Sequence, residues 1–138
     1  MTALSARTVS VSIDRDPDAV YRYVRDPRNL PHWAPGFAKA VRADTGGWVV
    51  ETADGPVRVT FAADNVLGVL DHRVSDDQGL DVLNPMRVIA NADGAEVLFT
   101  LFRSVDASDD QFRGDLGLVE ADLQTLKRML EGSARSRG

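Results

Sequence analysis

The order of hydrophobic patterns along the chain constrains its fold more than any other feature. An alternating stretch at Arg7–Ile13 predicts a strand, two short helical segments follow it, and further alternating stretches with turn signals come next. A long amphipathic helix at Asp109–Glu131 completes the series. One helix must cover the apolar face of such a sheet, and a strongly curved sheet beneath a helix tends to enclose a cavity. The pattern predicts an α+β domain in which a curved antiparallel sheet wraps around a C-terminal helix.

The chain has 138 residues, enough for one sizeable core but not for two. We find no linker, repeat or low-complexity segment in it. We therefore expect a single domain over residues 1–131 and a flexible tail over residues 132–138, where glycine, serine, alanine and arginine predominate.

Composition and charge narrow the classes of partner. The net charge is −5 and no basic stripe occurs, so we expect no nucleic acid partner. No apolar run approaches the roughly 20 residues of a membrane span, so we expect no membrane insertion. The first residues lack the pattern of a signal peptide, which favours a cytoplasmic location. There is no cysteine and only two histidines, far apart, so we expect no metal site and no cofactor.

Aspartate–proline pairs mark the two short helices. Asp16 supplies a helix cap and Pro17 suits the first helical position. Asp26 and Pro27 end that helix and begin a shorter one, which extends through Leu30. We expect the proline-bracketed segment that follows to be irregular and to form a rim or lid.

An Asp54-Gly55 turn predicts the first hairpin. As a two-residue loop it would pair Val50 with Val59 and would expose Glu51 opposite Arg58. The residues then expected on the inner face are Trp48, Val50, Thr52, Val57, Val59 and Phe61.

Asp93-Gly94 predicts a second hairpin of the same kind. In this register Asn84 and Arg103 face each other, pointing inward near the end of the sheet, and Pro85 indicates an edge or a bulge there. The inner-face residues are Met86, Val88, Ala90, Val97, Phe99 and Leu101, whereas Ile89 and Leu98 would pair on the outer face and could mark a homodimer contact.

A third strand, Val69–Ser75, contains the most informative polar residue. Its alternation places either His72 or the pair Asp71 and Arg73 inside. Burying two charges costs more than burying one imidazole, so we predict that His72 points inward and that the charged pair is exposed.

The final helix has its own start and stop signals. Ser108 and Gln111 form a capping-box pattern, and Gly132 is a suitable terminator. Gly114 and Gly117 are unfavourable inside a helix, which suggests a close approach to the sheet or a bend over the cavity.

Four stretches resemble the START-like (SRPBCC) superfamily with the helix-grip fold, often labelled polyketide cyclase/dehydrase, and one of them also resembles bacterial members in particular. The stretches are Val9–Ile13 (VSVSI), Asp16–Val24 (DPDAVYRYV), Asp26–Trp33 (DPRNLPHW) and Gly68–Val74 (GVLDHRV). The resemblance extends over roughly Arg7 to Leu130. It implies a ligand-binding domain with a cavity between sheet and long helix, in which members bind lipids, hormones, polyketides or antibiotics and some catalyse ring closure.

The inner aromatic residues are candidates to line a pocket for an aromatic or acyl ligand, although they could equally fill the core. His72 is the one candidate catalytic residue. It could form a hydrogen bond with a ligand carbonyl or transfer a proton, or its ring could instead form a hydrogen bond with a neighbouring group of the protein. Arg103 could bind an acidic or phenolic ligand, or could extend to solvent. The candidate ligand-binding residues are Trp33, Trp48, Phe61, His72, Met86, Phe99 and Arg103.

The predicted function is binding of a small hydrophobic or amphipathic molecule, similar to a polyketide, a lipid or an aromatic compound. One alternative is a cyclase or aromatase-like enzyme that uses His72 as acid and base. The other is a protein-interaction module without a bound ligand. No catalytic signature decides whether the protein is an enzyme.

Overall fold

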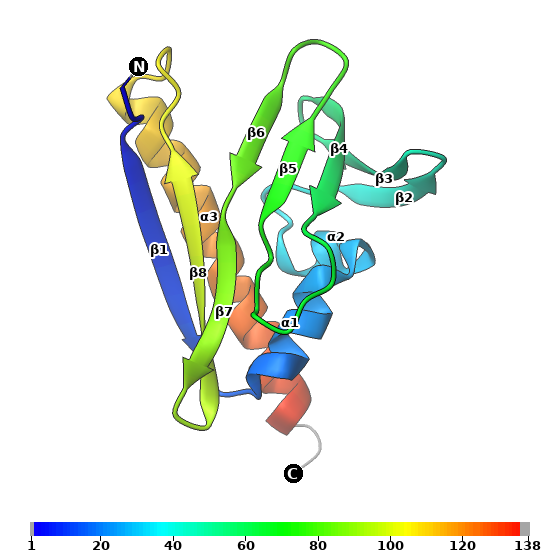
Figure 1. The fold of residues 1–138 in the computed structure, drawn as a ribbon, viewed down its shortest axis with the longest axis vertical. Coiled ribbons are helices and arrows are strands. Elements are labelled where there is room, and N and C mark those ends of the chain that lie inside the picture. Colours follow the sequence, from blue (N-terminus) through cyan, green and yellow to red (C-terminus); the bar gives the residue numbers. More distant parts are fainter. Residues whose placement is uncertain (1, 136–138) are drawn as a thin grey trace.

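The computed structural model describes the backbone of residues 2–135 and the side chains of residues 2–132. The first strand is followed by helices, then by seven strands and the long helix (Figure 1). The elements are β1 (Ala6–Ile13), α1 (Pro17–Arg25), a 3₁₀ turn (Pro27–Asn29), α2 (Leu30–Trp33), β2 (Ala40–Asp44), β3 (Gly47–Thr52), β4 (Gly55–Phe61), β5 (His72–Ser75), β6 (Asp81–Asn84), β7 (Met86–Asn91), β8 (Gly94–Phe102) and α3 (Asp109–Arg135).

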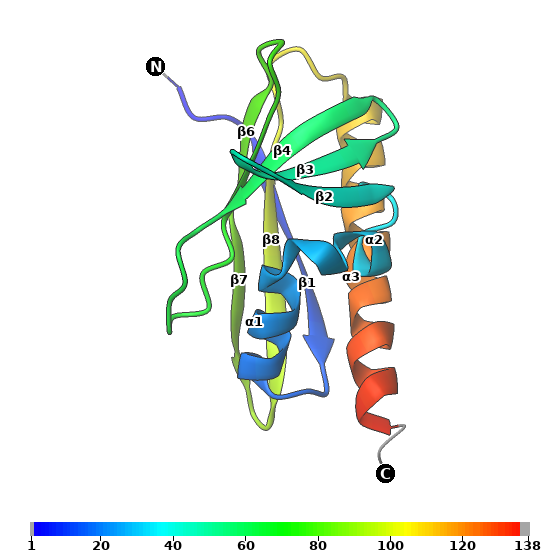
Figure 2. The ribbon, with the colours of Figure 1, turned by 90° about the vertical axis from the view of Figure 1, so that its right-hand side faces the viewer.

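The strands form one curved antiparallel surface. Neighbouring strands pair in the orders β1-β8-β7 and β2-β3-β4-β5-β6. The two groups are continuous because β6 leads directly into β7 through Pro85. The segment before β5 also pairs with β7, through a bridge between Val69 and Arg87 in the same register that pairs His72 with Asn84. Helix α3 packs against β1, α2 and β8, while α1 packs against β7 and β8 (Figure 2). The predicted α+β helix-grip architecture, with two short helices after the first strand, is confirmed.

The first hairpin has the predicted faces but a different register. Thr52 pairs with Gly55, so the loop is Ala53-Asp54, and Val50 pairs with Val57 rather than Val59. Gly55 follows the loop with φ of 110°, a conformation that favours glycine. The predicted cross-strand pair of Glu51 with Arg58 is wrong. A shift of two residues preserves the faces because side chains alternate with a period of two.

The second hairpin is shifted in the same way. Asn91 pairs with Gly94 around an Ala92-Asp93 loop, and Met86 pairs with Phe99. A Cβ atom on Gly94 would lie 2.6 Å from the carbonyl oxygen of Ile13, so glycine is needed there for a close approach to β1.

Two predicted pairs are therefore wrong. Asn84 lies opposite His72, not Arg103. Ile89 lies opposite Glu96, not Leu98.

Helix α3 begins as predicted and ends later. Ser108 Oγ accepts a hydrogen bond from the Gln111 N–H at 3.1 Å, and Gln111 Oε1 accepts one from the Ser108 N–H at 2.9 Å. The helix continues to Arg135, so Gly132 does not terminate it, and residues 136–138 of the predicted tail lie outside the described residues. A Cβ atom on Gly114 or Gly117 would meet nothing within 4 Å, so neither glycine marks a close approach.

Within residues 2–135, no helix combines the length and hydrophobicity needed to cross a membrane.

Candidate functional site

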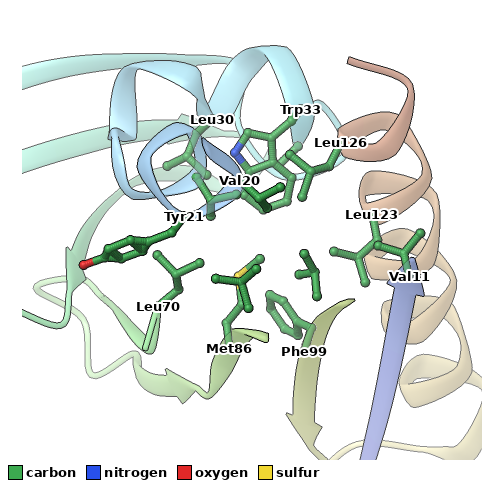
Figure 3. Close-up of a cluster of buried hydrophobic side chains, with 14 of the residues drawn as sticks. Val11, Val20, Tyr21, Leu30, Trp33, Leu70, Met86, Phe99, Leu123 and Leu126 are labelled. Carbon is green, nitrogen blue, oxygen red and sulfur yellow. The ribbon is translucent and has the colours of Figure 1, made fainter. Parts of the chain in front are cut away.

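One half of the space between sheet and helices is tightly packed. Side chains from α1, α2 and the C-terminal half of α3 meet those of β1, β7 and β8 there (Figure 3). The residues with the lowest exposure, at most 2%, include Ile13, Val20, Val24, Leu70, Met86, Val97, Leu123 and Leu126, and Val50 of β3 is buried to the same degree in the same cluster. Met86, a predicted ligand contact, belongs to this packed half and has no exposed surface.

The other half of the inner face is apolar but only partly covered. Val82 faces inward beside Val74, yet 40% of Val82 is exposed while Val74 is buried. Trp48 and Phe61, on the same face of β3 and β4, are half-buried. The other inward-facing residues of these strands, including Val50 and Val59, are buried, so access to this part of the inner face is limited to the surroundings of Trp48, Phe61 and Val82.

His72 lies at the boundary between the two halves. The residue is 9% exposed, and its ring lies between Phe61 and Phe99, with centroids 5.1 and 5.5 Å away. Nδ1 lies 3.1 Å from the carbonyl oxygen of Leu70. Burial lowers the pKa of His72, because the apolar surroundings disfavour the charged form. The predicted inward orientation of His72 is confirmed.

A row of three paired residues crosses the inner face at His72. Phe61 lies opposite His72 on one side, and Asn84 lies opposite it on the other. Asn84 is half-buried, and its amide has no hydrogen-bond partner within residues 2–132. The sequence placed Asn84 inward but assigned it the wrong neighbour, because the neighbour depends on the register.

The charged neighbours of His72 point to the outer face. Asp71 forms an ion pair with Arg87 at 3.0 Å and accepts a hydrogen bond from the Met86 N–H at 2.9 Å. Arg87 lowers the pKa of Asp71. Arg73 pairs with Asp81 at 2.7 Å, so the predicted pairing of Asp71 with Arg73 is wrong. Both charged side chains lie on the outer face as predicted, where Arg73 is exposed and Asp71 is half-buried.

Trp33 belongs to a short helix, not to an irregular rim. It is the last residue of α2, is 4% exposed, and points into the core beside Leu126 (Figure 3). Its Nε1 is buried without a hydrogen-bond partner in the described part of the chain. Since a buried N–H normally has a partner, this donor is an unusual feature of the core.

Arg103 lies away from the other predicted site residues. Its Nη2 and Nε donate hydrogen bonds to the carbonyl oxygen of Ala107 at 2.8 and 3.1 Å, and its guanidinium pairs with Asp109. These contacts hold the connection between β8 and α3.

Asp122 is a buried carboxylate that sequence reasoning missed. It is 8% exposed and accepts a hydrogen bond from the Gly36 N–H at 3.1 Å. Burial raises the pKa of Asp122. A signal was present, because Asp122 follows Val119 by three residues and precedes Leu126 by four, which places it on the same helical face as these two apolar residues.

Two hollows on the surface lie elsewhere. One of about 590 Å³ is lined by Ser12–Asp16 and Asn91–Ala95. The other, of about 380 Å³, lies between β1 and α3. Neither is lined by any of the predicted site residues.

The sequence matches the family described as polyketide cyclase/dehydrase and lipid transport over residues 6–132, nearly the whole chain. The chain belongs to this family. A comparison with curated protein sequences gives no match. Membership in the polyketide cyclase/dehydrase and lipid transport family agrees with the resemblance seen in the sequence and with the helix-grip architecture.

Several solved structures share the fold at low sequence identity. Protein XoxI from Bacillus cereus is 17% identical with a TM-score of 0.72, over 92% of this chain and 96% of its own. The Zhui aromatase/cyclase from Streptomyces sp. R1128 is 16% identical with a TM-score of 0.72, over 98% of each chain. The Aha1 dimer from Colwellia psychrerythraea is 14% identical with a TM-score of 0.62, over 93% and 97%. These similarities concern the fold.

Proposed function

We propose that this member of the family binds a small hydrophobic or amphipathic molecule against the open half of the inner face, with His72 at its inner end. One observation carries the proposal: the inward-facing apolar residues Val82 and Phe61 stay partly exposed, although their neighbours Val59 and Val74 on the same face are buried. Exposed apolar surface in a concave wall is typical of a ligand site.

The family description and the aromatase/cyclase among the similar structures support a ligand of polyketide, lipid or aromatic character. Of the predicted ligand contacts, Trp48, Phe61 and His72 adjoin the open half, and Phe99 closes its inner end against the His72 ring. Met86 and Trp33 support it from the packed core. Arg103 is not part of the proposed site.

A cyclase-like enzyme is the second candidate, and the position of His72 favours it. An imidazole that is held neutral in apolar surroundings can accept a proton from a substrate. Asp71 cannot assist it as a catalytic pair, because Asp71 points to the opposite face and binds Arg87. His72→Ala distinguishes the candidates: an enzyme loses nearly all turnover, whereas ligand affinity falls only by the contribution of one contact.

A homodimer through the outer face is the alternative that involves a protein partner. Leu83, Ile89 and Phe102 are 41%, 49% and 43% exposed there. A concentration series by light scattering tests it, and a mass of one chain at every concentration would rule it out.

Two neighbouring residues of β6 provide a matched test of ligand binding. Val82 faces inward and Leu83 faces outward, with exposures of 40% and 41%. Val82→Trp should fill the open half and abolish the fluorescence increase of Prodan, a neutral apolar dye, whereas Leu83→Trp should leave it unchanged. Equal dye binding by both variants would contradict the proposed site. Native mass spectrometry of protein purified without added ligand would identify any retained molecule.

A further inference from the structure

The hydrogen bond between His72 and Leu70 determines where the imidazole carries its hydrogen. Nδ1 of His72 lies 3.1 Å from the carbonyl oxygen of Leu70. A carbonyl oxygen only accepts hydrogen bonds, so Nδ1 must be the donor. A neutral imidazole has one N–H, which leaves Nε2 without a hydrogen and with an available lone pair.

This acceptor is unused by the protein. Within the described residues Nε2 of His72 has no hydrogen-bond partner, and unlike the buried Nε1 of Trp33 it keeps some contact with solvent, so a ligand can reach it. Asn84, directly opposite on the same face, also has an unused amide. Paired side chains on one face of an antiparallel ladder lie about 4.5–5.5 Å apart at Cβ, close enough for both to contact one small group.

The surrounding charges disfavour an anionic group at this point. The arginines on the strands around His72, namely Arg58, Arg73 and Arg87, lie on the outer face and pair there with Asp44, Asp81 and Asp71. A carboxylate placed at Nε2 would bring lone pairs against a lone pair, with none of these cations beside it.

We infer that the site selects a neutral hydroxyl, phenolic or alcoholic, which donates its hydrogen to Nε2 of His72 while its oxygen accepts one from the Asn84 amide. This inference rests on the proposed ligand binding and names the polar group of the ligand. A ligand whose only polar group is a carbonyl or an ether oxygen cannot satisfy Nε2.

The tautomer can be measured without any ligand. Long-range ¹H–¹⁵N correlation spectra of labelled protein distinguish Nδ1–H from Nε2–H, and the chain has only two histidines. His32→Gln, at an exposed position, assigns the signals. We expect Nδ1–H for His72, and finding Nε2–H would overturn the inference.

Ligand selectivity is tested with 2-naphthol and 2-methoxynaphthalene, which share a ring system but differ in the donor hydrogen. By calorimetry, naphthol should bind the unmodified protein roughly two- to tenfold more tightly, the usual effect of one hydrogen bond. His72→Phe should reduce the ratio to about one. Asn84→Ala should weaken both ligands and retain the ratio, because the ether oxygen can also accept.

The outcomes separate the two proposals. Equal affinities in the unmodified protein would overturn the hydroxyl selectivity and leave ligand binding intact. Binding of neither compound would overturn both. If His72→Phe does not fold, the tautomer and the affinity ratio of the unmodified protein still decide.

Discussion

Asp122 of α3 accepts a hydrogen bond from the backbone N–H of Gly36, with Oδ1 and N 3.1 Å apart. The bond ties the long helix to the segment between α2 and β2. The carboxylate is buried, and burial raises its pKa above the ordinary value of 3.8. Near neutral pH the protein therefore carries the cost of a buried charge at this point.

Replacing Asp122 with asparagine should stabilise the protein at pH 7. Asparagine keeps an oxygen for the Gly36 N–H but has no charge to desolvate. A carboxyl whose folded pKa is raised contributes stability below its unfolded pKa and loses that contribution as the pH rises through the folded pKa. Urea unfolding should show the largest gain for Asp122→Asn at pH 7 and a smaller gain near pH 4. Asp115→Asn, at an exposed position of α3, is the control and should change little.

The buried His72 should make folding sensitive to acid. Its folded pKa is lowered from 6.5, so the unfolded chain binds a proton first as the pH falls. Stability is then fully present above pH 6.5 and is lost as the pH falls toward the folded pKa. We expect the free energy of unfolding of the unmodified protein to fall more steeply between pH 7 and pH 5 than that of His72→Phe. Parallel curves would contradict this, and His32→Gln should retain the slope of the unmodified protein.

Two glycines should respond in opposite ways to alanine. Gly94→Ala would place a Cβ atom 2.6 Å from the Ile13 carbonyl oxygen, a backbone atom that cannot easily move. We expect a loss of about 1–3 kcal/mol in the free energy of unfolding. Gly114→Ala meets nothing within 4 Å and should stabilise α3 by about 0.5–1 kcal/mol. Chemical denaturation measures both, and a neutral Gly94→Ala would show that β1 and β8 can separate locally.

Alanine substitutions on the inner face should cost different amounts of stability at packed and at partly exposed positions. Met86 has no exposed surface, so Met86→Ala should cost about 2–5 kcal/mol through the cavity it leaves. Val82 points to the same side of the sheet but is 40% exposed, so Val82→Ala should cost about 1 kcal/mol or less. Similar losses for both variants would indicate that the β6 part of the inner face is as tightly packed as the rest.

Alternation of apolar and polar residues predicted the faces of the strands correctly, and the pairing less well. His72, Val57 and Phe99 point inward as expected. Both hairpins nevertheless differ from the predicted register by two residues, because each glycine follows the loop instead of lying within it. A shift of two residues exchanges every cross-strand neighbour but no face, so the neighbours of Asn84 and Glu51 could not be predicted from alternation.

Local periodicity is enough to predict the element order, the inward side of each strand and the apolar face of the long helix. Packing in three dimensions determines which part of the inner face α3 covers, and so which apolar residues stay accessible beside His72. It also decided the contacts of Asp122 with Gly36 and of His72 with Leu70 and Asn84. Such contacts depend on the register and on how elements distant in sequence pack, and residue spacing does not encode either.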